Sequence, residues 1–151
     1  MTTTIVKQKM TYEEFLNYEN DTGYLYELED GELTQSPLES FLNLRIAMFL
    51  VAHFLKRGIP SNYLYTKLEV AVSSDSINVR LPDLTVLSKQ LYNAAKETKR
   101  SLITLDMPAP DLVVEVVSPN QAKRDYEDKR SEYCNRGIPE YWIVDPVLQK
   151  M

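Results

Sequence analysis

The sequence is poor in the side chains that build thiol chemistry and soft-metal sites. Its 151 residues include one cysteine, Cys134, and one histidine, His53. One cysteine cannot form an internal disulfide, and a zinc site or a cysteine–histidine nucleophile pair needs more of these residues. Because no basic segment followed by an apolar one opens the chain, we expect a cytoplasmic protein. His53 lies in an apolar stretch, so we expect it in the core or an interface.

Long apolar runs and glycine-rich loops are also missing. The most apolar stretch covers residues 41–55, but it contains Asn43, Arg45 and His53. It is shorter than the roughly 20 residues that a membrane-spanning helix needs. We therefore expect a buried core helix here and no membrane association. The sequence has four glycines and no glycine-rich phosphate loop.

An excess of positive charge is missing too, because the formal net charge is −5. Strong non-specific binding of nucleic acid needs clustered lysine and arginine, so any such contact must use local patches. Residues 11–32 are acidic without any lysine or arginine, and we expect them to repel a phosphate backbone. The basic residues gather in two groups: Lys96, Lys99 and Arg100, then Lys123, Arg124, Lys129, Arg130 and Arg136. These groups form either solvated helix faces or a path for phosphates.

What is present predicts one mixed domain over residues 1–151, with an N-terminal helix and hairpin over 1–35 and a core over 36–146. With 44% hydrophobic residues, this length can bury a core without disulfides. The fold class is α/β (α+β), a mixed central sheet flanked by helices. The expected elements are a helix over 12–19, a hairpin turning at 30–31, a helix over 37–56, strands over 64–72 and 80–87, a helix over 88–96, a strand over 111–117, a helix over 122–135 and a strand over 141–144.

Local signals mark several of these boundaries. Thr11 with Glu14 is a capping-box pattern, and Asp30-Gly31 between strand-like runs is a hairpin signal. Ser36 before Pro37 indicates a helix start. Apolar residues alternate from 64 to 72, and Pro82 demands a bulge or an edge position in the next strand. The last strand, helix and strand predict a right-handed crossover with parallel strands.

Two acidic residues interrupt the apolar strand-like runs. Asp83 lies in the run from 80 to 87, and Glu115 lies in the run from 111 to 117. Ionised carboxylates are costly to bury unless they are paired, hydrogen bonded or bound to a metal. If the two strands are neighbours, both carboxylates can meet and hold a divalent cation. Lys129 follows on the next helix, where it can orient a water or hold a phosphate.

Each candidate residue also has a purely structural explanation. Asp83 after Pro82 is a common turn element, and Glu115 could pair with a buried arginine such as Arg80. Lys129 could form a surface ion pair with Asp125. Glu39 is the natural third acid, because its helix precedes the sheet, but a position in the helix cap explains it without metal. Glu69, on the wetter face of its strand, competes with Glu39 for this role.

The runs RLPDLTVL, PDLVVEVVSP, RDYEDKRSEY and RGIPEYWIVDP resemble those of the Uma-type family of restriction endonucleases, in the PD-(D/E)XK superfamily. The resemblance covers most of the chain and implies the restriction-endonuclease-like fold. It implies that Asp83 and Glu115 hold Mg²⁺ or Mn²⁺, with Glu39 as the acid on the first core helix. The superfamily lysine normally lies two residues after the second acid, where this chain has Val117, and Lys129 could reach the same volume. Relatives also continue with further strands beyond Asp145-Pro146.

These observations predict a Mg²⁺-dependent endonuclease that hydrolyses DNA, with Asp83, Glu115 and Lys129 as its catalytic residues. The alternative is a non-catalytic binding or assembly module on the same fold, which Val117 and the negative net charge favour. A glycosidase that uses two carboxylates is a third and less favoured interpretation. We expect a homodimer, because one small acidic domain offers little area for contact with DNA.

Overall fold

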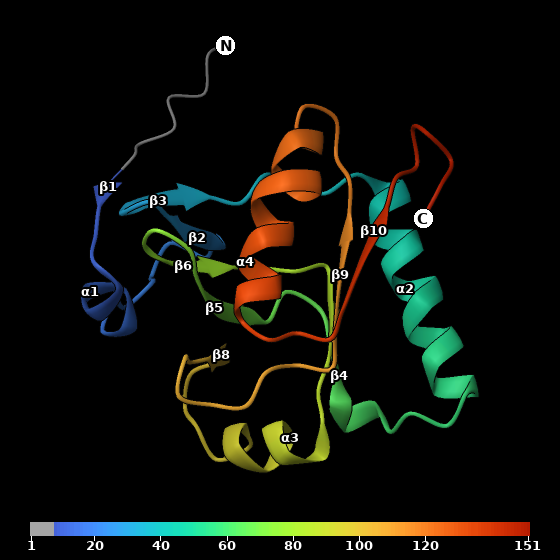
Figure 1. The fold of residues 1–151 in the computed structure, drawn as a ribbon, viewed down its shortest axis with the longest axis horizontal. Helices are drawn as coiled ribbons and strands as arrows, with labels where there is room; N and C mark the ends of the chain where they lie inside the picture. The colour runs from blue at the N-terminus through green and yellow to red at the C-terminus, as the bar shows by residue number, and fades with distance from the viewer. Residues whose placement is uncertain (1–7) are drawn as a thin grey trace.

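The computed structural model describes residues 8–151, which form two β-sheets and four α-helices (Figure 1). The α-helices are α1 (Tyr12–Leu16), α2 (Phe41–Lys56), α3 (Lys89–Ala95) and α4 (Lys129–Asn135). The strands are β1 (Gln8–Lys9), β2 (Tyr26–Glu29), β3 (Glu32–Gln35), β4 (Leu64–Tyr65), β5 (Glu69–Ser73), β6 (Ile77–Arg80), β7 (Leu84–Val86), β8 (Leu102–Ile103), β9 (Leu112–Val116) and β10 (Glu140–Val144). A 3₁₀ turn (Ser61–Tyr63) precedes β4, and a π-helical turn (Arg124–Asp128) leads into α4.

Both sheets mix parallel and antiparallel neighbours. The large sheet has the order β1-β3-β2-β6-β5-β8, in which only β5 and β8 are parallel. The small sheet has the order β10-β9-β7-β4, in which only β10 and β9 are parallel. The predicted fold class is confirmed, including the parallel crossover from β9 through α4 to β10. The central sheet is, however, divided in two.

The chain passes between the two sheets several times, and two of these crossings are short and lie next to each other. It leaves the small sheet after β4, enters the large sheet at β5, and returns between β6 and β7. The predictions of continuous strands over 64–72 and 80–87 are therefore wrong, because each range spans one crossing. Lys67 has a positive φ of 54° in the first crossing, and Pro82 interrupts the second. The Lys67 N–H donates to the Pro82 carbonyl at 3.2 Å, which ties the two crossings together.

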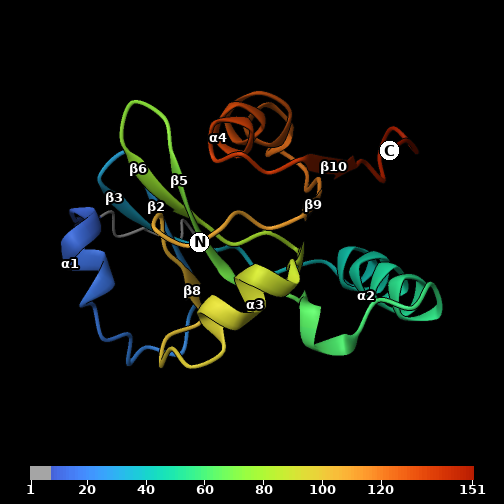
Figure 2. The same cartoon turned by 60° about the horizontal axis from the view of Figure 1, so that its bottom comes forward.

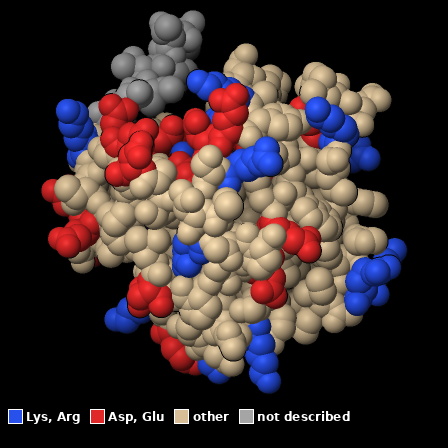
Figure 3. Space-filling view, in the orientation of Figure 1, with Lys and Arg blue, Asp and Glu red and all other residues tan. Residues whose placement is uncertain are grey.

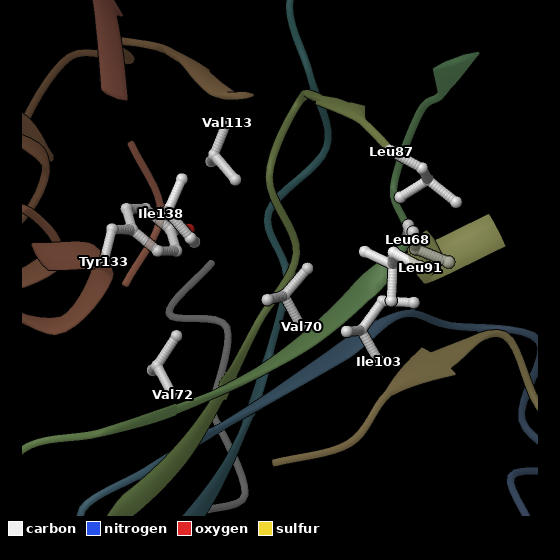
Figure 4. Packing of buried hydrophobic residues seen from close by; sticks show 9 residues of the cluster. All are labelled: Leu68, Val70, Val72, Leu87, Leu91, Ile103, Val113, Tyr133 and Ile138. Carbon is white, nitrogen blue, oxygen red and sulfur yellow. The ribbon is translucent and has the colours of Figure 1, made fainter. Parts of the chain in front are cut away.

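Helices cover both faces of each sheet (Figures 1 and 2). On the large sheet, Phe15 of α1 packs against Leu28 and Leu33 of the hairpin. On the opposite face, Tyr133 of α4 joins a buried cluster that includes Val70 of β5 and Val113 of β9 (Figure 4). The other face of β9 packs against α2 through a cluster of Leu50, Phe54, Leu84, Val86, Leu112 and Val114. Strand β9 is thus buried on both faces, which explains its nearly continuous apolar sequence.

The capping box and the hairpin turn that the sequence predicts near its N-terminal end are both present. Thr11 and Glu14 make both hydrogen bonds of the capping box, although α1 ends at Leu16, earlier than expected. The hairpin turns at Asp30 and Gly31, which both have positive φ angles, 51° and 76°. This is the conformation that an Asp-Gly pair favours in a two-residue hairpin loop.

The start of α2 differs from the prediction. Ser40, not Ser36, is the N-cap, and its hydroxyl accepts a hydrogen bond from the Asn43 N–H at 3.1 Å. Residues 36–39 therefore precede the helix, and Glu39 takes no part in a capping box. The result frees the Glu39 carboxylate for contacts across the molecule.

Helix α2 is also less buried than its sequence predicts. Leu50 and Phe54 lie in the core, whereas Phe41 and Phe49 are 77% and 69% exposed. His53 is exposed beside the ring of Phe49, so it does not lie in the core. No helix in the described part of the chain is both long and apolar enough to cross a membrane.

Candidate functional site

A small pocket lies where the two sheets meet, and all four predicted site residues line it. These are Glu39, Asp83, Glu115 and Lys129. The pocket has a volume of about 40 Å³. It can hold an ion or a few water molecules, whereas sites for larger ligands usually have several hundred Å³. A sugar ring does not fit, which argues against the glycosidase interpretation.

Strand register brings the two predicted acids side by side. Leu84 of β7 pairs with Val114 of β9, so Asp83 and Glu115 adjoin one residue further along. The Asp83 Oδ2 accepts a hydrogen bond from the Val116 N–H at 2.6 Å. Asp83 itself lies in the crossing before β7, not in the middle of a strand. Pro82, in the same crossing, interrupts the strand just before Asp83, and the Asp83 carboxylate lies in the pocket.

Lys129 forms the centre of one half of the pocket. Its Nζ lies 3.0 Å from Glu115 Oε1, 3.1 Å from Asp125 Oδ1 and 3.9 Å from Glu27 Oε1. The Tyr133 hydroxyl donates to the same Glu115 Oε1 at 2.8 Å. Asp125, Lys129 and Tyr133 recur at four-residue spacing, so the π-helical turn and α4 present all three toward the sheet. The Asp125–Lys129 ion pair exists, but it is buried inside the site and not on the surface.

Lys67 forms the centre of the other half. Its Nζ lies 2.7 Å from Asp83 Oδ1 and 3.0 Å from Glu39 Oε1. The second oxygen of Glu39 accepts from Asn43 Nδ2 at 3.2 Å, and the same amide donates to Ser118 Oγ at 3.0 Å. Lys67, in the first crossing, thus bridges Asp83, in the second crossing, to Glu39, which precedes α2.

Burial raises the pKa of the two predicted acids in this pocket, Asp83 and Glu115. It raises the pKa of Glu115 to about 8, although the Lys129 ammonium opposes the shift. Burial likewise raises the pKa of Asp83, against the influence of Lys67. Burial alone would lower the pKa of Lys129, but Glu115, Glu27 and Asp125 outweigh it and raise this pKa. The pocket therefore holds more carboxylates than its two ammonium groups fully stabilise in the ionised form.

Comparisons with known proteins identify the family and the fold of this chain. The model of a family described as "Uma2: Putative restriction endonuclease" matches residues 12–151. The chain belongs to the Uma2 family. A solved structure described as a putative nuclease belonging to DUF820, from Anabaena variabilis ATCC 29413, is similar with a TM-score of 0.70 and 19% sequence identity. The similarity covers 91% of this chain and 75% of that one, and it shows a shared fold. A search of curated proteins finds none that matches.

In this Uma2 chain a buried ionic network holds α4 against the large sheet. Arg80 of β6 donates from Nε and Nη2 to the two oxygens of Glu132, both at 2.7 Å. Asn78 donates to Glu132 Oε1 at 2.8 Å, and Arg80 also contacts Glu27 and Glu29. A buried ion pair between Arg80 and Glu115 was the alternative to metal binding by Glu115. Arg80 contacts Glu132 instead, so this alternative is wrong. The network instead fixes the helix that carries Lys129.

Glu27 links this network to the pocket. Burial would raise its pKa, but Lys129, Arg80 and Arg124 together lower it to about 2. The carboxylate also accepts the Leu81 N–H at 2.9 Å. Residues 11–32 were expected to form an acidic surface, and Glu27 contradicts this expectation because only 6% of it is exposed.

Lys67 and Glu27 line the pocket, but neither is among the residues predicted from the sequence. Both residues lie in stretches where apolar and polar residues alternate, which indicates ordinary strands. No neighbouring residue type distinguishes either of them from a solvent-exposed residue of such a strand. Glu69, the competing third acid, pairs with Arg100 at 2.9 Å and does not line the pocket. Among the described residues, Glu39 is thus the better candidate.

Much of the basic charge is used inside the protein. Arg124 pairs with Glu27 and Glu29, and the half-buried Arg136 donates to backbone carbonyls of Ala71, Thr104 and Met107. On the face seen in Figure 3, lysine and arginine are scattered among acidic side chains, without one large basic patch. Within the two predicted basic groups, four side chains are exposed: Lys96, Lys99, Lys123 and Arg130.

The donor chemistry of the pocket fits a hard divalent cation, since Mg²⁺ and Mn²⁺ prefer carboxylate oxygens. Among residues 8–151, however, no three side chains of the metal-binding types are grouped closely enough to hold an ion as they stand. The ammonium groups of Lys67 and Lys129 contact the candidate acids instead. A bound cation therefore requires at least one of these contacts to open.

Proposed function

We propose that this chain is a Mg²⁺- or Mn²⁺-dependent endonuclease that hydrolyses phosphodiester bonds in DNA. The observation that carries the proposal is the meeting of Asp83, Glu115 and Lys129 in one pocket of a Uma2-family fold. Asp83 and Glu115 would hold the cation, with Glu39 as a third oxygen donor. A bound divalent ion supplies the lowered pKa of a water molecule that can attack phosphorus.

Lys129 is the lysine that this site offers in place of one at Val117. Val117 is buried, and its N–H donates to the Val144 carbonyl at 2.8 Å. Lys129 approaches the same strand from α4, and its Nζ lies 3.0 Å from Glu115. Its ammonium holds the Glu115 carboxylate in place and can donate to a phosphate oxygen that enters the pocket.

Cleavage of supercoiled and linear DNA in Mg²⁺ and in Mn²⁺ tests the proposal. We expect nicking by the unchanged chain and at least a hundredfold loss in Asp83→Asn and in Glu115→Gln, since each removes a charged oxygen donor. Asp111→Asn and Glu97→Gln are matched controls, because both side chains are exposed and outside the pocket. Cleavage that survives both site substitutions would contradict the assignment.

A non-catalytic binding module is the second candidate, and the two lysine–carboxylate contacts favour it. If these ion pairs are the final state of the pocket, divalent ions will not bind there. The melting temperature then stays constant in millimolar Mn²⁺, whereas a nuclease site that binds the ion raises it by mass action.

We also infer that the chain acts as a cytoplasmic homodimer. The inference of a dimer is supported by the exposed apolar side chains Leu38, Phe41, Leu44, Met48 and Phe49 on and beside α2. Such patches on soluble proteins often mark an interface. Light scattering of the unchanged chain and of Phe49→Ser should show a dimer and a monomer, respectively, and a monomer in both would refute the inference.

A further inference from the structure

Lys67 occupies the place between two candidate metal ligands. Its ammonium lies 2.7 Å from Asp83 and 3.0 Å from Glu39, and neither contact passes through another side chain. The contact with Asp83 has the length of a charge-assisted hydrogen bond, and the contact with Glu39 is slightly longer. In electrostatic terms, Lys67 does for these carboxylates what a bound cation would do.

Lys67 is also placed so that it can leave. Its side chain is 24% exposed, against 8% for Lys129. It stands on a crossing between the sheets, whereas Lys129 is fixed on α4 by three carboxylates. A long lysine side chain at the rim of a pocket can move its charge into water at little cost, while a buried one cannot.

We propose that Lys67 is a built-in counter-ion, which holds Asp83 and Glu39 in the metal-free protein and withdraws when a divalent cation binds them. This proposal rests on the proposed function, because it assumes that Asp83 and Glu39 are metal ligands. It adds a regulatory property to the same site: the cation must compete with a tethered ammonium.

Two consequences follow from this competition. Metal affinity is lower than the carboxylates alone would give, because binding breaks two charge-assisted contacts. The carboxylates also remain paired when no metal is bound, so the empty pocket does not leave them facing each other without a cation.

Binding of Mn²⁺ to the 151-residue chain, measured by calorimetry at low salt, tests the proposal. We expect Lys67→Met to lower the dissociation constant about tenfold or more, the size expected when a charge-assisted contact no longer has to be broken. Lys67→Arg keeps a cation at this place and should remain within about threefold of the unchanged chain. Lys89→Met removes the same charge from an exposed site at the start of α3 and should also remain near the unchanged value.

The outcomes separate this proposal from the proposed function. If the unchanged chain and Lys67→Met bind Mn²⁺ equally well, the counter-ion proposal fails, whereas the proposed metal binding stands. If neither binds Mn²⁺, both proposals fail. If Lys67→Met binds more tightly than the unchanged chain and Lys89→Met does not, the counter-ion proposal is supported.

A measurement on the unchanged chain covers the case in which Lys67→Met does not fold. Nuclear magnetic resonance of ¹⁵N-labelled lysine ammonium groups can follow Lys67 during a titration with Mg²⁺, with Lys67→Arg used to assign its signal. We expect this signal to shift or disappear as the ammonium enters water, while that of Lys89 stays constant. A Lys67 signal that stays unchanged throughout the titration would overturn the proposal.

Discussion

In both halves of the pocket a lysine ammonium neutralises buried carboxylates, but the two lysines differ in burial and in the element that carries them. In one half, Lys129 is buried on a helix and is surrounded by Glu115, Asp125 and Glu27. In the other, Lys67 is partly exposed on a crossing and bridges two acids. The contrast indicates that a lysine–carboxylate contact can be either a permanent part of the fold or a replaceable part of a site. Burial and the rigidity of the supporting element decide which it is.

The largest expected difference between the halves lies in stability. Lys129→Met leaves three buried carboxylates without their shared cation, so we expect the free energy of unfolding to fall by about 3–5 kcal/mol. Lys67→Met should cost less, about 1–2 kcal/mol, because the Lys67 side chain is partly exposed although Asp83 is buried. Urea unfolding followed by the fluorescence of Trp142, the one tryptophan, measures both. Equal losses would show that the two contacts are of the same kind.

The support behind Lys129 gives the next largest effect. Glu132→Gln removes the charge that Arg80 contacts through two hydrogen bonds, and we expect a loss of about 2–3 kcal/mol. Glu127→Gln, an exposed change on the preceding turn, should alter stability by about 0.5 kcal/mol or less. If both substitutions cost the same, the Arg80 network does not fix α4.

Proton competition should appear in the affinity for Mn²⁺. The pKa values of Glu115 and Asp83 are raised, so a larger share of these groups is protonated at lower pH. Because a cation binds the deprotonated form, the dissociation constant should fall as pH rises from 6 toward 8, by up to about tenfold per pH unit, and then level off. Calorimetry at several pH values measures this, and an affinity that falls with rising pH would contradict it.

The smallest effect concerns the orientation of Glu115. Tyr133→Phe removes one buried hydrogen bond to Glu115 Oε1 and keeps the ring in the core, so we expect a loss of about 1 kcal/mol. Urea unfolding again provides the measurement. Tyr92→Phe, on the partly buried surface of α3, is the control and should be nearly neutral. A neutral Tyr133→Phe would mean that Lys129 alone holds Glu115.

The half of the site around Lys129 could be predicted from the sequence, and the structure shows why. Glu115 interrupts an apolar strand, and the four-residue spacing of Asp125, Lys129 and Tyr133 places them on one helix face. Both signals are periodic and local, so they depend little on the rest of the fold. Their convergence on one pocket followed from a single strand–helix connection.

In the other half, Asp83 and Glu39 could be predicted as candidate acids, but the Lys67 bridge between them could not, because it depends on where the sheets separate. Alternation from 64 to 72 continues through Lys67 without a glycine or proline, and nothing in it marks a crossing. At the start of α2, Ser36 and Ser40 are both acceptable N-caps, and packing selects the second. That choice places Glu39 before the helix and within reach of Lys67. Tertiary contacts decided both points, and local propensity did not.

The β4–β5 and β6–β7 crossings are hydrogen bonded to each other and together connect the two sheets. Asp83 lies in the β6–β7 crossing, and Glu115 lies in β9 of the small sheet. The hydrogen bond from the Lys67 N–H to the Pro82 carbonyl holds the two crossings together. A ligand bound to both Asp83 and Glu115 would therefore connect this crossing to the small sheet. The exchange rate of the Lys67 backbone amide hydrogen would report how often this hydrogen bond between the crossings breaks.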